Sequence, residues 1–234
     1  TLGVGGGYSQ KDVQELARIL TGMGIGNKPE PPKVKPEWRD QVVQEGLFVF
    51  NPARHDFGEK RFLGHRIAGA GISEVDQAAD LLARNPATAR HISGKLAAYF
   101  TGDAPPAALV DRMSKTFLST DGDIAATLKT LFDSPEFSAS LKKGVFKDPV
   151  HYVYSSLRLA YGGMPPIQNP RTGVGLLKQL GQPLNQRLTP DGYPMSQSDW
   201  AGSGQMTARF EAASVIAGSP ERFYKAAPNR PPPE

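Results

Sequence analysis

Three side chains that could do chemistry lie close together in the stretch FVFNPARHDFGEKRFLG, residues 48–64. His55 and Asp56 are adjacent, and Lys60 follows four residues after Asp56. An imidazole and a carboxylate can ligate a divalent metal or move a proton in acid–base catalysis. An ammonium group can stabilise negative charge that develops on a substrate. We therefore take His55, Asp56 and Lys60 as candidate catalytic residues, and His55 and Asp56 as candidate metal ligands.

The same stretch also has a purely structural interpretation. An aspartate in a turn often accepts a hydrogen bond from the backbone two residues later, so Asp56 would bind the amide of Gly58 while Lys60 pairs with an acid. The sequence contains three further histidines, so few additional metal ligands are visible. A metal or proton-transfer site and a polar turn therefore both stay open on the sequence alone.

A second candidate region is TPDGYPMSQSDW, residues 189–200. Its proline and glycine predict irregular structure, and Tyr193 and Trp200 supply two large aromatic rings. Exposed rings of this kind can form a platform for a sugar or a peptide. Alternatively, the segment is a lid that closes over the helical core with its apolar side chains buried. We take Tyr193 and Trp200 as candidate ligand-binding residues and leave both interpretations open.

The composition removes several classes of function. The 234 residues include no cysteine, which excludes thiol catalysis, disulfides and thiolate metal sites. The net charge is +4, from 27 basic and 23 acidic side chains without a long run of one sign, so we expect no nucleic-acid partner. No apolar run approaches the ~20 residues of a membrane span, so we expect no membrane-spanning segment. The glycine-rich start lacks the lysine of a phosphate-binding loop, and no serine lies in G-x-S-x-G.

The elements that must position these residues are mostly helices. Apolar residues recur at helical spacing in many segments. Capping residues, such as Ser9 with Asp12 three residues later as a capping box, and Asn-Pro or Asp-Pro pairs mark where helices begin. A short β-hairpin with a long tip is predicted from residues 47–50 and 61–63. We expect a mainly α fold, a multi-helix bundle of antiparallel helical hairpins with one small β-hairpin. Residues 1–226 would form a single α-helical domain, followed by a proline-rich tail at residues 227–234.

The order of these segments resembles the bacterial family called domain of unknown function 1800. The resemblance rests on TLGVGGGYSQKDVQELARILTGMGI, FVFNPARHDFGEKRFLG, DQAADLLARNPATARHISGKLAAYF, LVDRMSKTFLSTDGDIAATLKTLFDSPEF, KDPVHYVYSSLRLA, GYPMSQSDW and the final helix that carries Arg209. It spans nearly the whole chain. The family pattern includes the positions of His55, Asp56, Gly58 and Lys60, and it adds Arg209 as a third candidate ligand-binding residue. Many members have Trp at the position of Tyr193.

Family members are usually much longer than this chain, so the resemblance implies that it is the C-terminal half of a longer protein. It begins at Thr1 rather than at Met, and we expect it to have been processed, truncated or cut from that protein. The N-terminal half of the same polypeptide would then be a partner. The resemblance also implies export to the periplasm or the extracellular space, and a neighbouring protein related to the alkaline-phosphatase superfamily as a second partner. It implies no established activity.

Three functions remain open at this point. The first is an exported accessory or binding protein that acts with a partner on the cell envelope or on an extracellular polymer, with no cofactor expected. The second is a metal-assisted hydrolase in which the loop of His55 and Asp56 holds a divalent metal and Lys60 stabilises the developing charge. The third is a structural scaffold fragment. Whether the protein is an enzyme is left undecided.

Overall fold

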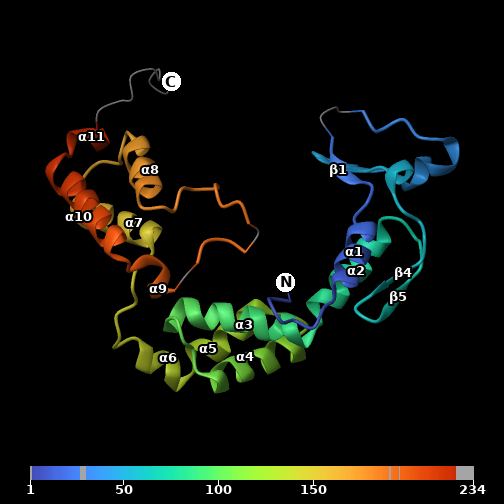
Figure 1. The fold of residues 1–234 in the computed structure, drawn as a ribbon, viewed down its shortest axis with the longest axis horizontal. Coiled ribbons are helices and arrows are strands. Elements are labelled where there is room, and N and C mark those ends of the chain that lie inside the picture. Colours follow the sequence, from blue (N-terminus) through green and yellow to red (C-terminus); the bar gives the residue numbers. More distant parts are fainter. Residues whose placement is uncertain (1, 27–29, 190, 195, 225–234) are drawn as a thin grey trace. The chain divides into compact units, whose positions relative to one another are not determined.

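The computed structural model describes residues 2–26, 30–189, 191–194 and 196–224. The mainly α class is confirmed (Figure 1). We expected one domain over residues 1–226, whereas the chain divides into two compact units. Unit 1 comprises residues 1–100 and 105–138, and unit 2 comprises residues 101–104 and 139–234. The proline-rich tail predicted at residues 227–234 lies outside the described residues.

Unit 1 begins with helices, short strands and two 3-10 turns. Its elements are α1 (Gln10–Ile19), β1 (Met23–Ile25), η1 (Pro36–Gln41), β2 (Val43–Glu45), β3 (Phe48–Phe50), η2 (Pro52–Arg54), β4 (Lys60–Phe62), β5 (His65–Ile67), α2 (Ser73–Ala83), α3 (Pro86–Thr101), α4 (Ala107–Ser119), α5 (Ile124–Phe132) and α6 (Pro135–Ser140). Helix α3 ends in unit 2, and α6 crosses the boundary between the units.

The sequence predicted that residues 47–50 pair with residues 61–63, and this pairing is wrong. Strand β3 lies between β1 and β2 in a three-stranded antiparallel sheet, whereas β4 pairs with β5 in a separate two-stranded sheet. Three-residue strands carry too little side-chain pattern to specify a distant partner. The segment between β3 and β4 is therefore the connection between two sheets, and not the tip of one hairpin.

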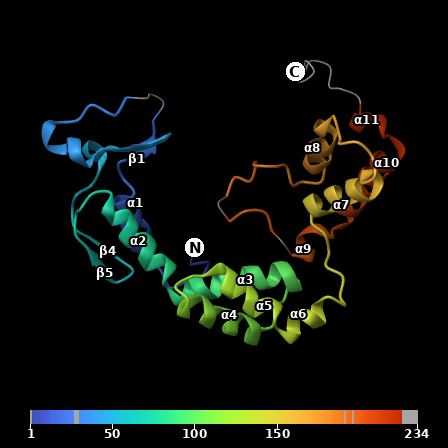
Figure 2. The same ribbon diagram turned by 180° about the vertical axis from the view of Figure 1, so that it is seen from behind.

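Helix α1 anchors the β4–β5 hairpin. Ser9 and Asp12 form the predicted capping box at its start. Oδ2 of Asp12 accepts the backbone amide of Ser9, and Oδ1 accepts the backbone amide of Leu63 at 2.8 Å. Leu63 and Gly64 both have positive φ, at 49° and 81°, as a two-residue turn of this type between antiparallel strands requires. Figures 1 and 2 show α1 beside both α2 and this hairpin.

The cores of unit 1 follow from the apolar stripes of its helices. The first joins α1, the hairpin and α2 through Ile19, Phe62, Ile67 and Ala78, all almost fully buried. The second lies among α3, α4 and α5, which neighbour one another in Figure 2, and it consists of Ala97, Leu109, Val110, Met113 and Leu131. Short connections between these helices give the antiparallel hairpins expected from the sequence.

Unit 2 is a smaller group of helices. Its elements are α7 (Pro149–Tyr161), α8 (Pro170–Gln179), α9 (Gln197–Trp200), α10 (Ser203–Gly218) and α11 (Glu221–Tyr224). Asp148 caps α7 through the amide of His151, as its Asp-Pro start predicts. The buried residues of its core are Val153, Leu157, Tyr161, Leu176, Leu177, Leu180, Ala212, Ile216 and Phe223.

In the part of the chain that the structure describes, none of the helices combines the length and the apolar character needed to cross a bilayer.

Candidate functional site

His55 lies inside unit 1, between the end of α1 and the start of α2. Its Nε2 is 3.0 Å from Oε1 of Glu74, and its Nδ1 is 2.8 Å from the carbonyl oxygen of Thr21. The ring also makes an edge contact with Phe57, with 4.8 Å between the ring centroids. Because both ring nitrogens already face protein oxygens, a metal could bind His55 only after one of these contacts is broken.

Lys60 points into the same interior. The side chains of Lys60 and Glu74 are both completely buried, and Nζ lies 2.5 Å from Oε2 of Glu74. The ammonium group also donates to the carbonyl of Asp56. Lys60 therefore pairs with an acid, as the structural interpretation predicts, and its charge is turned away from solvent and from any substrate outside.

Glu74 joins these groups into what we call the buried charge cluster, consisting of His55, Lys60 and Glu74. Its Oε1 also accepts the backbone amides of Ala70 and Gly71 at 2.8 and 3.2 Å. Burial raises the pKa of Glu74, but the hydrogen bonds from Lys60, His55 and Ala70 lower it by more, so the pKa lies below its ordinary 4.5. A charged carboxylate thus holds the loop of His55 against the turn before α2.

Asp56 lies at the edge of this cluster and faces outward. Its Oδ2 accepts Nε of Arg18 at 2.7 Å, and its Oδ1 accepts the amide of Gly58 at 2.8 Å. The hydrogen bond from Arg18, together with that from Gly58, lowers the pKa of Asp56 to about 2. The predicted turn hydrogen bond to Gly58 is confirmed, and the carboxylate is already matched by a guanidinium.

Sequence reasoning missed Glu74 and Thr21. One signal was available for Glu74, because it lies four residues before the buried Ala78 and eight before Leu82, on the apolar face of α2. A carboxylate on such a face needs buried donors. Thr21 carried no comparable signal. Its carbonyl oxygen and its Oγ1 lie 2.8 and 3.2 Å from Nδ1 of His55, but a threonine 34 residues before a histidine predicts no such contact.

The second candidate region lies in unit 2 and is partly closed. Trp200 is 6% exposed, and its indole N–H donates to the carbonyl of Pro194 at 2.8 Å. Tyr193 is half-buried, and its hydroxyl donates to the carbonyl of Pro183 at 2.9 Å. The two ring centroids are 6.5 Å apart. Trp200 is therefore enclosed, and its ring does not offer an open platform.

Arg209 is also buried. It is 5% exposed, and its guanidinium lies between the rings of Phe146 and Tyr152, at 4.6 and 4.9 Å from their centroids. Its Nη2 donates to the carbonyl of Lys147 at 2.7 Å, while its Nε is buried without a hydrogen-bond partner among the described residues. Burial lowers the pKa of Arg209. Arg209 therefore braces the interior of unit 2.

The structure thus separates the candidates into two groups, with His55, Asp56 and Lys60 in unit 1 and Tyr193, Trp200 and Arg209 in unit 2. Among residues 2–26, 30–189, 191–194 and 196–224, no three His, Asp or Glu side chains are grouped so that they could hold a metal ion.

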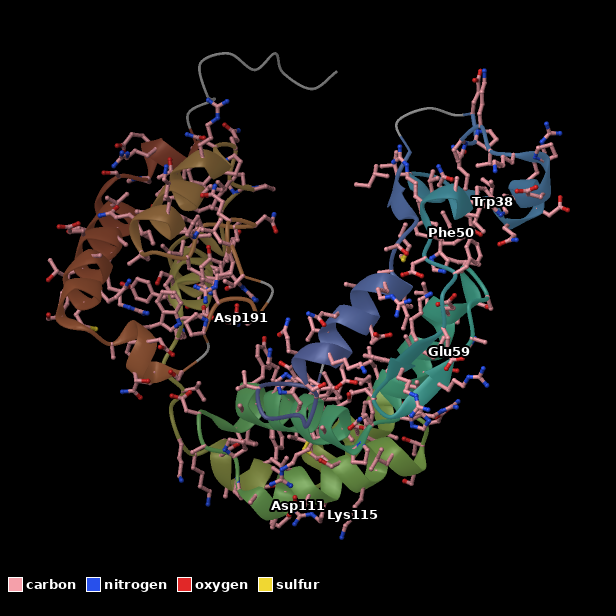
Figure 3. All side chains as sticks on the ribbon, turned by 45° about the vertical axis from the view of Figure 1, so that its right-hand side comes forward. Trp38, Phe50, Glu59, Asp111, Lys115 and Asp191 are labelled. Atoms are coloured by element: carbon pink, nitrogen blue, oxygen red, sulfur yellow. The ribbon has the colours of Figure 1, made fainter. Side chains whose placement is uncertain are left out.

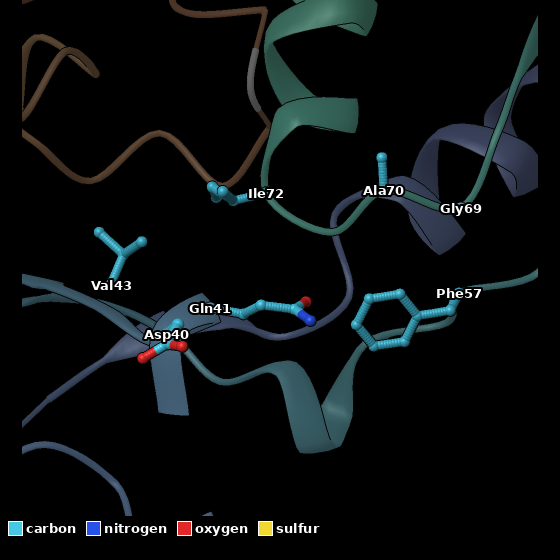
Figure 4. Close-up of a pocket in the computed structure, with 7 residues that line it drawn as sticks. All are labelled: Asp40, Gln41, Val43, Phe57, Gly69, Ala70 and Ile72. Atoms are coloured by element: carbon cyan, nitrogen blue, oxygen red, sulfur yellow. The ribbon is translucent and has the colours of Figure 1, made fainter. Parts of the chain in front are cut away.

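A pocket of about 370 Å³ opens beside the buried charge cluster in unit 1 (Figure 4). It is lined by Asp40, Gln41, Val43, Phe57, Gly69, Ala70 and Ile72. Figure 4 shows the amide of Gln41 directed toward the ring of Phe57. Sequence reasoning singled out none of these residues as ligand-binding, because they come from three separate stretches of the sequence that only the fold brings together.

The buried charge cluster fixes the walls of this pocket. The ring of Phe57 packs on His55, and the amide of Ala70 is bound by Glu74. Gly69 lies so close to Phe57 that a Cβ at this position would be 1.7 Å from the Phe57 carbonyl oxygen. Only glycine allows this approach of two backbone segments. The residues first considered for catalysis therefore support a cavity formed by their neighbours.

A family model described as "Protein of unknown function (DUF1800)" matches residues 1–231, nearly the whole chain. The resemblance found in the sequence is thereby confirmed. Neither a curated protein nor a solved structure matches the chain.

Proposed function

We propose that this chain, which belongs to the DUF1800 family of proteins of unknown function, is an accessory binding protein whose ligand occupies the pocket beside the buried charge cluster. The observation that carries the proposal is a difference in how polar side chains are used. His55, Asp56 and Lys60 are committed to contacts within the protein. Asp40 and Gln41 at the pocket are exposed and make no side-chain hydrogen bond or ion pair with the described residues.

Such groups are suited to binding because they do not have to give up a protein partner when a ligand arrives. The pocket walls are held in place by contacts to His55 and Glu74, so little ordering is needed on binding. Asp40 and Gln41 would supply the orienting polar contacts, and Phe57 would supply the apolar surface, which is the common composition of a small-molecule pocket.

The location and the partners belong to the same proposal. We place the protein outside the cytoplasm, at the cell envelope or on an extracellular polymer, together with the N-terminal half of its polypeptide and a phosphatase-like neighbour. The family resemblance supports these elements. The hydrolase alternative would require His55 to leave Thr21 or Glu74 before it binds a metal, and the scaffold alternative gives no role to the pocket.

Retention of the purified protein on washed cell-wall sacculi and on insoluble cellulose and chitin tests the proposal. The chain offers a matched control, because an Asp-Gln pair occurs both at the pocket, Asp40 and Gln41, and on the exposed face of α2, Asp76 and Gln77. We expect at least one polymer to retain the wild type and the D76A/Q77A variant but not the D40A/Q41A variant.

Two results would count against the proposal. Equal retention of all three proteins would show that binding does not use the pocket. Release of soluble sugar or peptide fragments from the polymer, abolished by His55→Gln but not by D40A/Q41A, would place a hydrolase at His55 instead.

A further inference from the structure

We propose that the pocket accepts a neutral, hydroxyl-rich ring of the size of one or two sugar units. This inference rests on the proposed function, since it names the chemical class of the ligand for the same pocket. Its volume of about 370 Å³ lies at the lower end of the range for small-molecule sites, ~300–1,000 Å³. A single short stretch of a polymer would fill it.

The charges around the pocket favour a neutral ligand. The seven lining residues include the carboxylate of Asp40 but no lysine or arginine. An anionic ligand would meet that carboxylate without a compensating cation. A cationic ligand would be attracted by Asp40, but this carboxylate is exposed, and an ion pair with an exposed side chain contributes little. A phosphate is therefore poorly suited to the pocket, and a polyamine would gain little over an uncharged molecule.

The polar side of the pocket matches hydroxyl groups. Asp40 is an acceptor only, whereas the amide of Gln41 offers both an acceptor and two donors. A hydroxyl group donates and accepts at the same time, so neighbouring hydroxyls on a ring can satisfy both side chains. The hydrogen bond to Asp40 would be charge-assisted, which strengthens it relative to a neutral one.

The apolar side of the pocket matches the face of a ring. Phe57 is half-buried, and its edge contact with His55 fixes its orientation. Val43 and Ile72 add aliphatic surface. A pyranose ring has a face of C–H groups and a rim of hydroxyls, so it can pack its face on Phe57 while its rim reaches Asp40 and Gln41.

Ligand-observed saturation-transfer NMR on the intact protein tests this assignment with three probes that share one ring. The probes are methyl β-glucoside, which is neutral, glucosamine, which is cationic, and glucuronate, which is anionic. We expect saturation transfer to the glucoside, unchanged in the D76A/Q77A variant. In the D40A/Q41A variant we expect the affinity to fall about tenfold or more, because two hydrogen bonds are lost. Phe57→Leu keeps apolar volume but removes the ring, and we expect it to weaken binding as well.

The possible failures are distinguishable. Preferred binding of glucosamine or glucuronate, dependent on Asp40 and Gln41, would overturn the ligand class and leave the pocket as a binding site. No binding of any probe, with polymer retention still dependent on Asp40 and Gln41, would do the same. No probe binding and no dependence of retention on these residues would overturn both the ligand class and the proposed function.

Discussion

Each of the two units buries a basic side chain, but they do so in different ways. In unit 1, Nζ of Lys60 lies 2.5 Å from the carboxylate of Glu74, with His55 on the other oxygen. In unit 2, Arg209 lies between Phe146 and Tyr152 and donates to a backbone carbonyl. The first arrangement neutralises charge with charge, whereas the second uses ring faces and a single peptide oxygen.

This difference between Lys60 and Arg209 indicates which unit depends more on each individual partner of its buried cation. Removing one member of a buried ion pair leaves the other charge in the interior, which is strongly destabilising. A buried cation without a carboxylate carries its desolvation cost already, so replacing it by an apolar side chain removes a cost as well as some contacts. We therefore expect unit 1 to be sensitive to single changes in its cluster, and unit 2 to tolerate a change of Arg209.

The two tryptophans allow the units to be followed separately, because Trp38 belongs to unit 1 and Trp200 to unit 2. Trp38 is labelled in Figure 3, in the same part of unit 1 as Phe50. A Trp200→Phe background leaves Trp38 as the fluorescent reporter of unit 1, and a Trp38→Phe background leaves Trp200 as the reporter of unit 2.

The largest effect is expected for Glu74→Ala. This change leaves Lys60 buried without its counter-charge and deprives the amides of Ala70 and Gly71 of their acceptor. The free energy of unfolding of unit 1 should fall by about 3–5 kcal/mol, measured by urea denaturation with Trp38 fluorescence. Asp76→Ala, an exposed change on the same helix, is the control. A loss below about 1 kcal/mol, the range of an exposed ion pair, would contradict the central role of Glu74.

A smaller loss is expected for Lys60→Met. Glu74 then keeps His55 and two backbone amides as donors, so its carboxylate is not left alone. The change removes the hydrogen bonds from Nζ to Glu74 and to the carbonyl of Asp56, and we expect the free energy of unfolding of unit 1 to fall by about 1.5–3 kcal/mol, the range for a hydrogen bond to a charged group. If this loss exceeded that of Glu74→Ala in the same urea titration, the amides and His55 would contribute less than their distances indicate.

A still smaller effect is expected for Arg209→Met in unit 2. Methionine keeps much of the volume between Phe146 and Tyr152, and the unpartnered Nε disappears. The free energy of unfolding reported by Trp200 should change by less than about 1.5 kcal/mol, as in other volume-conserving replacements. A loss as large as that of Glu74→Ala would remove the contrast between the two units.

The most modest effect concerns acid. The folded-state pKa of Asp56, about 2, lies below its ordinary 3.8, so its stabilising contribution is complete above about pH 4 and is lost as the pH falls toward 2. Its side chain is 39% exposed, so solvent reduces the effect. Arginine does not titrate in this range, so Arg209 adds no such dependence to unit 2. In urea titrations at pH 5 and pH 3, the Trp38 signal of Asp56→Asn should depend less on pH than that of the wild type. An identical pH dependence would contradict this assignment.

How much of this could be predicted from the sequence depended on how local each interaction is. The bond from Gly58 to Asp56 and the capping box of Ser9 span two and three residues, and both were predicted correctly. The pairing of β3 with β1 and β2 was not, because short strands do not encode a distant partner. The sequence predicted that Lys60 pairs with an acid. It did not identify that acid as Glu74, because this pairing depends on how α2 packs.

The candidate site was less predictable than the fold for the same reason. Residue types at residues 55–60 suggested catalysis, yet type alone does not say whether a side chain faces a cavity or the interior. The pocket combines η1, β2, the loop after η2 and the turn before α2. Two of the residues that line it, Asp40 and Gln41, look like ordinary surface residues in the sequence. Arg209 likewise belongs to the family pattern but is enclosed by two rings.

Because Lys60 is completely buried, the chemical modification of its amine reports on local unfolding. An acylating reagent can reach Nζ only while unit 1 is open, whereas the exposed Lys11 of the same unit is always accessible. The ratio of the two acylation rates therefore measures the free energy of that opening when closing is fast. Mass spectrometry that measures the acylation of Lys60 and Lys11 separately could thus follow the local opening of unit 1, without denaturant and without a substitution.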